Sequence, residues 1–249
     1  VVGIKLRAGL SGGAKDFLPY EKARQVADEL EFPIMMHLSL APPDTKTALS
    51  FLKPGDIVTH CYTGHTMKMI DDNGKILPEA KKAWEEGMIM DIAHGSGSLS
   101  FDSAEALISQ GYYPHTVSTD LHNLSIHGTN LMNPTEGVVK GDGKPAFDLL
   151  TCMDKMLCVG MPFPEIIKAT TSRPAEVLGS KGEIGTLKPG AHADIAGLVI
   201  DKGDYKLVDV HGQIRQSKDH IRNTFTILNG RLLNRIEVPK PPPWIELVK

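Results

Sequence analysis

The sequence predicts an α/β fold, a (β/α)₈ TIM barrel of which five strands are present, followed by a small β element. Strand-like runs alternate with helix-like segments, and this alternation is typical of a parallel sheet. The strand-like runs begin near residues 1, 33, 57, 89 and 115, so successive starts are 24 to 32 residues apart. A barrel of about 250 residues allots roughly 30 residues to each unit. Because five strands do not close a barrel, we expect the first three strands to precede Val1.

Each strand-like run ends at or near a side chain that can bind a metal or carry a proton. The runs and these side chains are Val1–Ile4 with Lys5, Pro33–Met36 with His37, Asp56–Thr59 with His60, Met88–Ile92 with His94, and His115–Thr119 with Asp120. One such histidine is usually a core or capping residue, but the whole ordered set is hard to obtain by chance. Since the carboxyl ends of parallel strands share one barrel mouth, we expect the five side chains to gather there.

The helices are predicted from apolar spacing and capping residues. Leu18–Leu30 places its apolar residues at helical spacing. Pro78–Glu86 begins with proline in its first turn, and the helix over 103–110 is capped by Asp102 and ended by Gly111. Further helical segments are expected over Thr45–Leu52, Ala146–Val159 and Pro164–Leu178.

After Gly179 the pattern changes to short β runs separated by Gly, Asp and Asn. Runs within 182–200, 204–212 and 223–233 predict a small antiparallel sheet, and Asn229-Gly230 is a strong hairpin turn signal. The final segment is rich in proline, which excludes regular helix and central strand there, and we expect Trp244 to anchor it.

Composition excludes several classes of protein. The formal net charge is −3, with 27 basic and 30 acidic residues spread along the chain, so we expect no nucleic-acid partner. No apolar run approaches the roughly 18 residues of a membrane span, so we expect no membrane partner. Three cysteines without a CxxC motif favour a reducing, cytoplasmic setting. No GxSxG nucleophile motif is present, and Ser11–Lys15 does not match a phosphate-binding loop.

These residues resemble the amidohydrolase superfamily, in particular its dihydroorotase-like and deacetylase-like branch. The resemblance is carried by the strand-end set, by ATTSRPAEVLG (169–179) and by GEIGTLKPGAHADI (182–195), while VTHCYTG (58–64) and DIAHGSGSLSF (91–101) narrow it toward deacetylases. It implies a hydrolase barrel over 1–179, from the fourth strand onward, then β-sandwich strands over 180–238 and a Pro-rich tail over 239–249.

The resemblance also implies roles for the strand-end residues. Lys5 would be carboxylated and bridge two divalent metal ions, expected to be zinc, and His37 and His60 would bind the more exposed ion. Asp120 would bind the more buried ion and pass a proton from a bridging hydroxide to the leaving group. The family's first-strand His-x-His pair has no counterpart in these 249 residues. Either it lies in a missing N-terminal segment or this chain is not catalytic by itself.

The segment His94, Gly95 and Ser96 is expected to bind the substrate, with amides and hydroxyls that hold a carboxylate; a flexible turn is the alternative. The other histidines are expected to be solvated or structural, namely His65, His122 and His127 in mouth-side loops, and His115, His192, His211 and His220 elsewhere. The predicted function is hydrolysis of an amide, or a similar ester, in a small-molecule substrate by a homo-oligomer. Ring opening of a cyclic amide and a non-catalytic assembly subunit remain alternatives.

Overall fold

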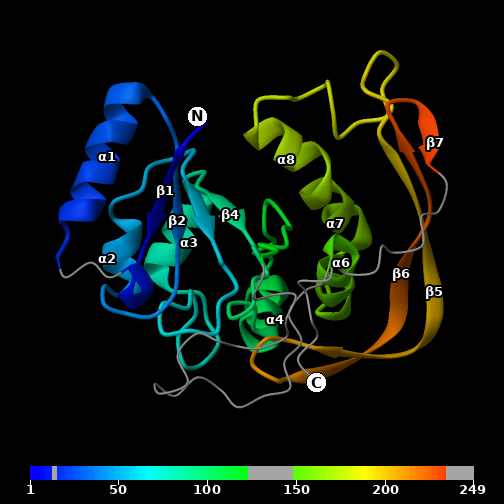
Figure 1. Ribbon diagram of the computed structural model, residues 1–249. Coiled ribbons are helices and arrows are strands. Elements are labelled where there is room, and N and C mark those ends of the chain that lie inside the picture. The colour runs from blue at the N-terminus through cyan, green and yellow to red at the C-terminus, as the bar shows by residue number, and fades with distance from the viewer. Residues whose placement is uncertain (13–15, 123–147, 234–249) are drawn as a thin grey trace, which may run out of the picture.

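The computed structural model describes residues 1–12, 16–122 and 148–233, and their strands form two separate sheets (Figure 1). The first sheet is parallel throughout, with the order β1-β2-β3-β4. Its strands are β1 (Ile4–Arg7), β2 (Ile34–His37), β3 (Ile57–Thr59) and β4 (Ile89–Asp91). The predicted parallel sheet is confirmed, whereas closure of a barrel stays a prediction.

The first strand lies later in the chain than expected. We predicted Val1–Ile4, but pairing with β2 begins at Ile4, which is aligned with Ile34, and continues to Arg7. A strand is defined by its partner, and residues before Ile4 have no neighbour to pair with among the described residues. Lys5 is therefore inside β1 rather than beyond its end.

The fifth predicted strand, His115–Thr119, is an extended segment with a single parallel bridge from Thr116 to Asp91. On its other side Val117 N donates to the carbonyl oxygen of Ala169, which belongs to a helix. A helix end cannot extend a ladder, so the segment follows the sheet without forming a regular strand.

Helices from the same part of the chain lie beside this sheet (Figure 1). They are η1 (Leu10–Gly12), α1 (Leu18–Leu30), α2 (Thr45–Leu49), α3 (Pro78–Glu85) and α4 (Phe101–Ser109). Of these, α1 packs against β1 and β2. The predicted Leu18–Leu30 helix is confirmed, and α3 matches its prediction to within one residue. The expected cap of α4 is wrong: Ser100, and not Asp102, accepts from the backbone N–H of Ser103.

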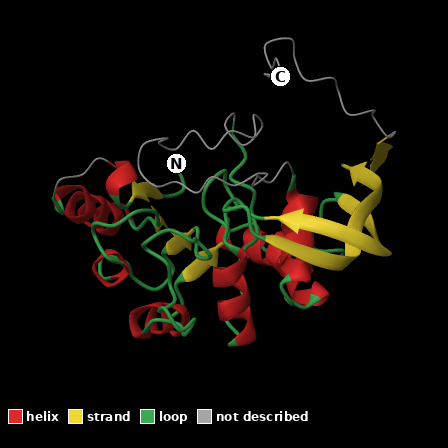
Figure 2. Cartoon of the chain, turned by 90° about the horizontal axis from the view of Figure 1, so that it is seen from below, coloured by secondary structure: helices red, strands yellow, loops and turns green. Residues whose placement is uncertain are grey.

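A second group of helices lies between the parallel sheet and the C-terminal strands (Figures 1 and 2). It consists of α6 (Leu149–Cys158), α7 (Phe163–Thr170) and α8 (Ser172–Val177). The single helix predicted over Pro164–Leu178 is broken at Thr171, whose φ and ψ are −134° and −84°. Pro174 lacks the N–H that a continuous helix would need, and it fits the first turn of a new one. Ala146, predicted to begin α6, is outside the described residues.

The second sheet is antiparallel, with the order β5-β6-β7. Its strands are β5 (Ile195–Val208), β6 (Ile214–Leu228) and β7 (Arg231–Leu233). The predicted antiparallel sheet and its Asn229-Gly230 turn, with φ of 49° and 74°, are confirmed. We expected short runs here, but the structure has two long strands. The turn-forming residues lie at bulges, at Gly197/Leu198 and Lys202/Tyr205, and do not end the strands. The sandwich expected over 180–238 stays a prediction, and Trp244 and the tail over 239–249 are outside the described residues.

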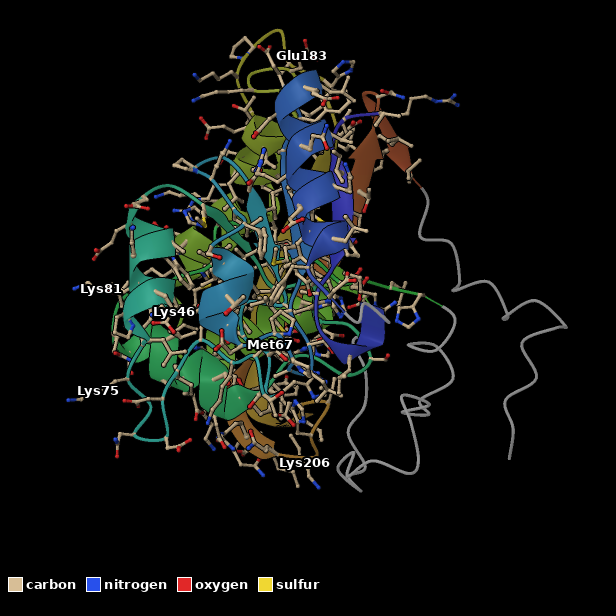
Figure 3. All side chains as sticks on the ribbon, turned by 90° about the vertical axis from the view of Figure 1, so that its left-hand side faces the viewer. Lys46, Met67, Lys75, Lys81, Glu183 and Lys206 are labelled. Carbon is tan, nitrogen blue, oxygen red and sulfur yellow. The ribbon has the colours of Figure 1, made fainter. Side chains whose placement is uncertain are left out.

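The core packs between the parallel sheet and its helices. Fully buried Met67 lies among packed side chains, whereas Lys75, Lys81 and Lys206 project outward (Figure 3). The tip of the β5–β6 hairpin is joined to α4, since Asp209 accepts from the N–H of Phe101 at 2.8 Å. Among the described residues, none of the helices combines the length and apolar character needed to cross a membrane.

Candidate active site

The register of the parallel sheet places two of the predicted site residues, Lys5 and His37, in two rows on one face. The first row contains Lys5, Met35, Ile57 and Ile89. The second row, nearer the carboxyl ends, contains Arg7, His37, Thr59 and Asp91. Since residues two apart on a strand point to the same side, both rows face the same space. The alternate residues, Leu6, Met36, Val58 and Met90, are buried in the core.

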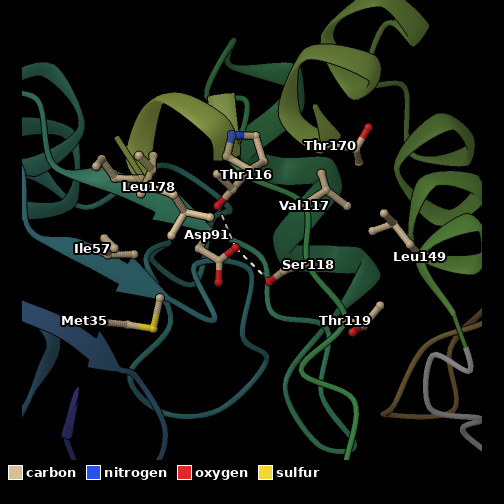
Figure 4. Close-up of a pocket in the computed structure, with 13 residues that line it drawn as sticks. Met35, Ile57, Asp91, Thr116, Val117, Ser118, Thr119, Leu149, Thr170 and Leu178 are labelled. Carbon is tan, nitrogen blue, oxygen red and sulfur yellow. Dashed lines mark hydrogen bonds between the residues drawn. The ribbon is translucent and has the colours of Figure 1, made fainter. Parts of the chain in front are cut away.

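The face that carries these rows borders a cavity of about 470 Å³ (Figure 4). Met35, Ile57 and Ile89 make its sheet side apolar, and Asp91 supplies a carboxylate. Figure 4 shows hydrogen bonds from Thr116 and Ser118 to that carboxylate. The apolar side chains of Met35, Ile57 and Ile89 are thus followed, toward the carboxyl ends, by the polar row.

His37 and His60 are brought into direct contact by β2 and β3. His37 is the last residue of β2, and His60 directly follows β3 in a left-handed conformation with φ of 65°. His60 Nε2 lies 2.8 Å from His37 Nδ1, and the rings meet edge to face. The convergence predicted for these two histidines is therefore present in the structure.

The protonation of this pair suits a metal ligand. His60 Nδ1 lies 2.7 Å from the carbonyl oxygen of Ala93, so it carries the proton and donates it, which leaves a lone pair on Nε2. Burial, followed by nearby positive charges, lowers the pKa of His37 to about 3. Burial likewise lowers the pKa of His60 to about 4, so both rings are neutral at pH 7.

Two lone pairs cannot face each other without a proton or a cation between them. If the proton of His37 is on Nδ1, that atom donates to His60 Nε2. If the proton is on Nε2 of His37 instead, this buried atom has no hydrogen-bond partner among the described residues. Nitrogens bound tetrahedrally to zinc at about 2.0–2.1 Å are roughly 3.3 Å apart, close to the observed spacing. The pair therefore fits a metal with a small outward movement.

Asp120 and Lys5 lie beside this pair. Asp120 Oδ2 is 3.9 Å from His60 Nε2, and the side chain is about half exposed. Desolvation raises the pKa of Asp120, opposed by His122 and Lys5, and desolvation lowers the pKa of Lys5, opposed by Asp120 and Asp91. Among the described residues, no three His, Cys, Asp or Glu side chains form a complete metal cluster. The described part of the site thus contains a histidine pair with a carboxylate and a lysine beside it.

Asp91 was not among the predicted site residues, although the structure gives it a central place. Its carboxylate accepts hydrogen bonds from the hydroxyls of Thr59 at 2.9 Å, Thr116 at 2.7 Å and Ser118 at 2.8 Å. It thereby holds the segment that leads to Asp120. The available signal was an aspartate inside an apolar run, followed by hydroxyl residues at alternate positions of the next run.

His94 is fully buried, and both of its ring nitrogens are engaged. Nδ1 is 2.8 Å from the carbonyl oxygen of Gly95, and Nε2 is 2.7 Å from Lys155 Nζ on α6. Gly95 lies at the mouth, where an added Cβ would be 3.1 Å from Asp120 Oδ2, and Ser96 Oγ is 3.5 Å from His122 Nε2. The imidazole thus faces the interior, whereas Gly95 and Ser96 face Asp120 and His122, and the substrate-binding role of all three stays a prediction.

The hairpin tip brings another histidine to the mouth loops. His211 stacks edge to face on His65 with ring centroids 5.5 Å apart, and it packs so closely on Gly64 that a Cβ there would lie 2.5 Å from its Nε2. Sequence reasoning assigned His211 to the C-terminal sheet and could not place it beside His65. His127 is outside the described residues.

No family model matches the chain. Among individual proteins, its curated relatives include deacetylases. A deacetylase of Enterococcus faecalis (strain ATCC 700802 / V583) is 34% identical over 235 residues, which cover 93% of this chain and 59% of the relative. A deacetylase of Agrobacterium fabrum (strain C58 / ATCC 33970) is 31% identical over 94% of this chain and 53% of its own length. The chain therefore spans between half and three fifths of these relatives.

Two solved structures are similar over the same part of the chain. An adenine deaminase superposes with a TM-score of 0.83 at 32% identity, covering 94% of this chain and 60% of that one. A dihydroorotase superposes with a TM-score of 0.78 at 30% identity, covering 94% of this chain and 57% of that one.

Proposed function

This chain belongs to the amidohydrolase superfamily. We propose that it forms the metal-binding part of the active site in a hydrolase that cleaves the carbon–nitrogen bond of a small acylated substrate. The observation that carries the proposal is the neutral His37–His60 pair, with its nitrogens 2.8 Å apart and a hydrogen bond that fixes the His60 tautomer. The named deacetylases among the relatives favour an acyl group as the part released.

Four residues would hold the metals: His37 and His60 through imidazole nitrogens, Asp120 through its carboxylate and Lys5 as a carbamate. A carbamate forms from the neutral amine, and the lowered pKa of Lys5, caused mainly by burial, favours that form. We propose zinc, which binds imidazole and carboxylate ligands in such sites. When bound, the two ions supply Lewis-acid chemistry and lower the pKa of water.

Asp120 is the residue we assign to proton transfer. Desolvation raises its carboxyl pKa, which suits a group that both accepts and returns a proton. It would take a proton from the attacking water and give it to the leaving nitrogen. Its side chain is about half exposed, so a substrate can reach it. The hydroxyls held by Asp91 keep its segment in place.

The test uses protein expressed from its complete coding sequence and loaded with zinc. We expect acetate release from N-acetylated small molecules, lost after chelation and restored by zinc. Ring opening of a cyclic amide without acetate release would instead support the runner-up, which the likeness to a dihydroorotase favours. Ammonia release from adenine alone would favour a deaminase, to which the chain is also similar. A protein that binds zinc but hydrolyses none of these would be the assembly subunit.

A further inference from the structure

We propose that the turn between β5 and β6 belongs to the active site, where its residue His211 is a positioning residue that holds the segment Gly95–Ser98 beside Asp120. This inference rests on the proposed hydrolase function, in which Asp120 transfers a proton. It also gives the C-terminal sheet a part in the reaction, which strand-end reasoning confined to the parallel sheet.

The turn between β5 and β6 is attached to α4, and the two lie together in Figure 1. Asp209 is fully buried, and its carboxylate accepts from the N–H of Phe101 at 2.8 Å and from the N–H of His211 at 2.9 Å. On β6, Arg215 forms an ion pair with Glu105 of α4 at 2.6 Å. Because its backbone is tied to α4 through Asp209, His211 presents its imidazole from a fixed base.

The imidazole of His211 contacts two loops at the mouth. Its Nε2 is 3.4 Å from the carbonyl oxygen of Ser98, and because a carbonyl only accepts, Nε2 is the donor in this contact. The N–H of Gly64 donates to the same oxygen at 3.0 Å. A Cβ at Gly64 would lie 2.5 Å from His211 Nε2, so the absence of a side chain there lets the ring approach. Ser98 is therefore held both by the loop after His60 and by the C-terminal sheet.

His65 contacts the residue before Ser98. Burial, followed by His211, lowers the pKa of His65, and a hydrogen bond with the backbone of Gly97 opposes this change. The rings of His65 and His211 meet edge to face, so each limits the movement of the other. The two imidazoles thus contact consecutive residues of the segment, Gly97 and Ser98.

The other end of the segment reaches the residue that we assign to proton transfer. The N–H of Gly95 donates at 3.0 Å to the carbonyl oxygen of Thr119, which directly precedes Asp120. A Cβ at Gly95 would lie 3.1 Å from Asp120 Oδ2 and 3.5 Å from Ser98 Oγ, so both side chains adjoin Gly95. A misplacement of about 1 Å can cost a reaction about 10²-fold in rate. Displacement of Ser98 should therefore change turnover.

The experiment compares His211→Phe with His211→Gln in zinc-loaded protein from the complete coding sequence, on the N-acetylated compound that the wild type cleaves fastest. Phenylalanine keeps a ring against His65 but cannot donate to Ser98, whereas glutamine has a donor at similar reach. In His211→Phe we expect kcat to fall by about 3- to 10-fold, as for one neutral hydrogen bond, with KM within about 2-fold. His211→Gln should recover most of this loss. His192→Phe, at an exposed histidine, is the matched control and should change neither constant.

Hydrogen exchange separates this inference from the proposed hydrolysis. The segment is followed through the amides of Gly95 and Leu99, which donate to the carbonyl oxygens of Thr119 and His94. Both amides should exchange faster in His211→Phe than in the wild type or His211→Gln, while β5 and β6 keep their protection. Faster exchange there supports the hold on the segment even if no amide is cleaved.

Three results would overturn the positioning role of His211 while hydrolysis still stands. The first is unchanged exchange of the two amides in His211→Phe. The second is an unchanged kcat in His211→Phe, or a loss confined to KM, because either would show that the segment does not act on the step that Asp120 serves. The third is an equal loss in His211→Phe and His211→Gln, which would mean that the ring only fills space.

Discussion

Lys155 Nζ lies 2.7 Å from His94 Nε2, inside the protein and out of contact with solvent. Because His94 Nδ1 donates to the carbonyl oxygen of Gly95, Nε2 is the acceptor and the lysine is the donor. Burial, and then the lysine charge, lower the pKa of His94 to about 3, while burial lowers the pKa of Lys155 to about 8. At pH 7 the pair is a neutral imidazole and a protonated amine.

This pair makes stability depend on pH. In the unfolded chain His94 titrates near 6.5, and in the folded protein near 3. Below pH 6.5 the unfolded state therefore binds more protons, so the free energy of unfolding falls as pH decreases. From pH 7.0 to 5.5 the His94 share of the loss is about 1 kcal/mol. Urea unfolding of metal-free protein at both pH values should show this loss, and His94→Gln should remove that share. His192→Gln, at an exposed site, should not; an unchanged pH dependence in His94→Gln would contradict the assignment.

Replacing either histidine of the pair should weaken metal binding. His37→Asn and His60→Asn each remove one imidazole ligand, and a site that loses a ligand loses affinity. We expect zinc affinity to fall at least about 10-fold, measured by competition with a chromophoric chelator. His192→Asn serves as the matched control. Wild-type affinity in both site variants would show that the pair is a structural contact.

Asp120→Asn should abolish turnover and leave most of the metal in place. An amide oxygen can still coordinate weakly, but it cannot accept a proton and return it. The loss in kcat should be about 10²–10⁴. Asp72→Asn, at a side chain that is 99% exposed, should keep full activity. Near-normal turnover by metal-replete Asp120→Asn would leave this residue a structural role only.

Asp91→Asn should destabilise the fold. The carboxylate accepts three hydroxyl hydrogen bonds, and the amide replaces one acceptor with a donor that faces hydroxyl groups. Hydrogen bonds to charged groups contribute about 1.5–3 kcal/mol, so we expect a loss of at least about 2 kcal/mol in chemical denaturation. Thr116→Val removes one of the three bonds and should cost less. In a double-mutant cycle the two changes should not be additive; strict additivity would argue against a shared network.

Local signals predicted the elements whose cause is local. The helix over Leu18–Leu30 was found from its own periodicity, and the Asn229-Gly230 turn from its dipeptide. The contact between His37 and His60 could also be predicted from the sequence, because the ends of adjacent parallel strands must lie together. The start of β1 was missed, since only its pairing with β2 defines it.

Contacts between distant segments could not be predicted from the sequence. Lys155 follows His94 by 61 positions, and the apolar helix that carries it gives no indication of its partner. His211 lies beside His65 because β5 and β6 are long enough for their turn to reach it. That length depends on bulges, which could not be predicted from the sequence. The position of Arg7 beside His37 likewise depends on the register between β1 and β2, which the sequence does not show.

The bond from Phe101 to Asp209 joins residues 108 positions apart. The same aspartate also accepts from the N–H groups of His211 and Gln213, so the turn that it organises and the start of α4 are stabilised together. As the chain is synthesised, the N–H of Phe101 at the start of α4 has no access to Asp209 until more than a hundred later residues have been added. Contacts of such high sequence separation slow folding, so the mouth loops beside α4 should be among the last parts of the chain to gain protection from hydrogen exchange.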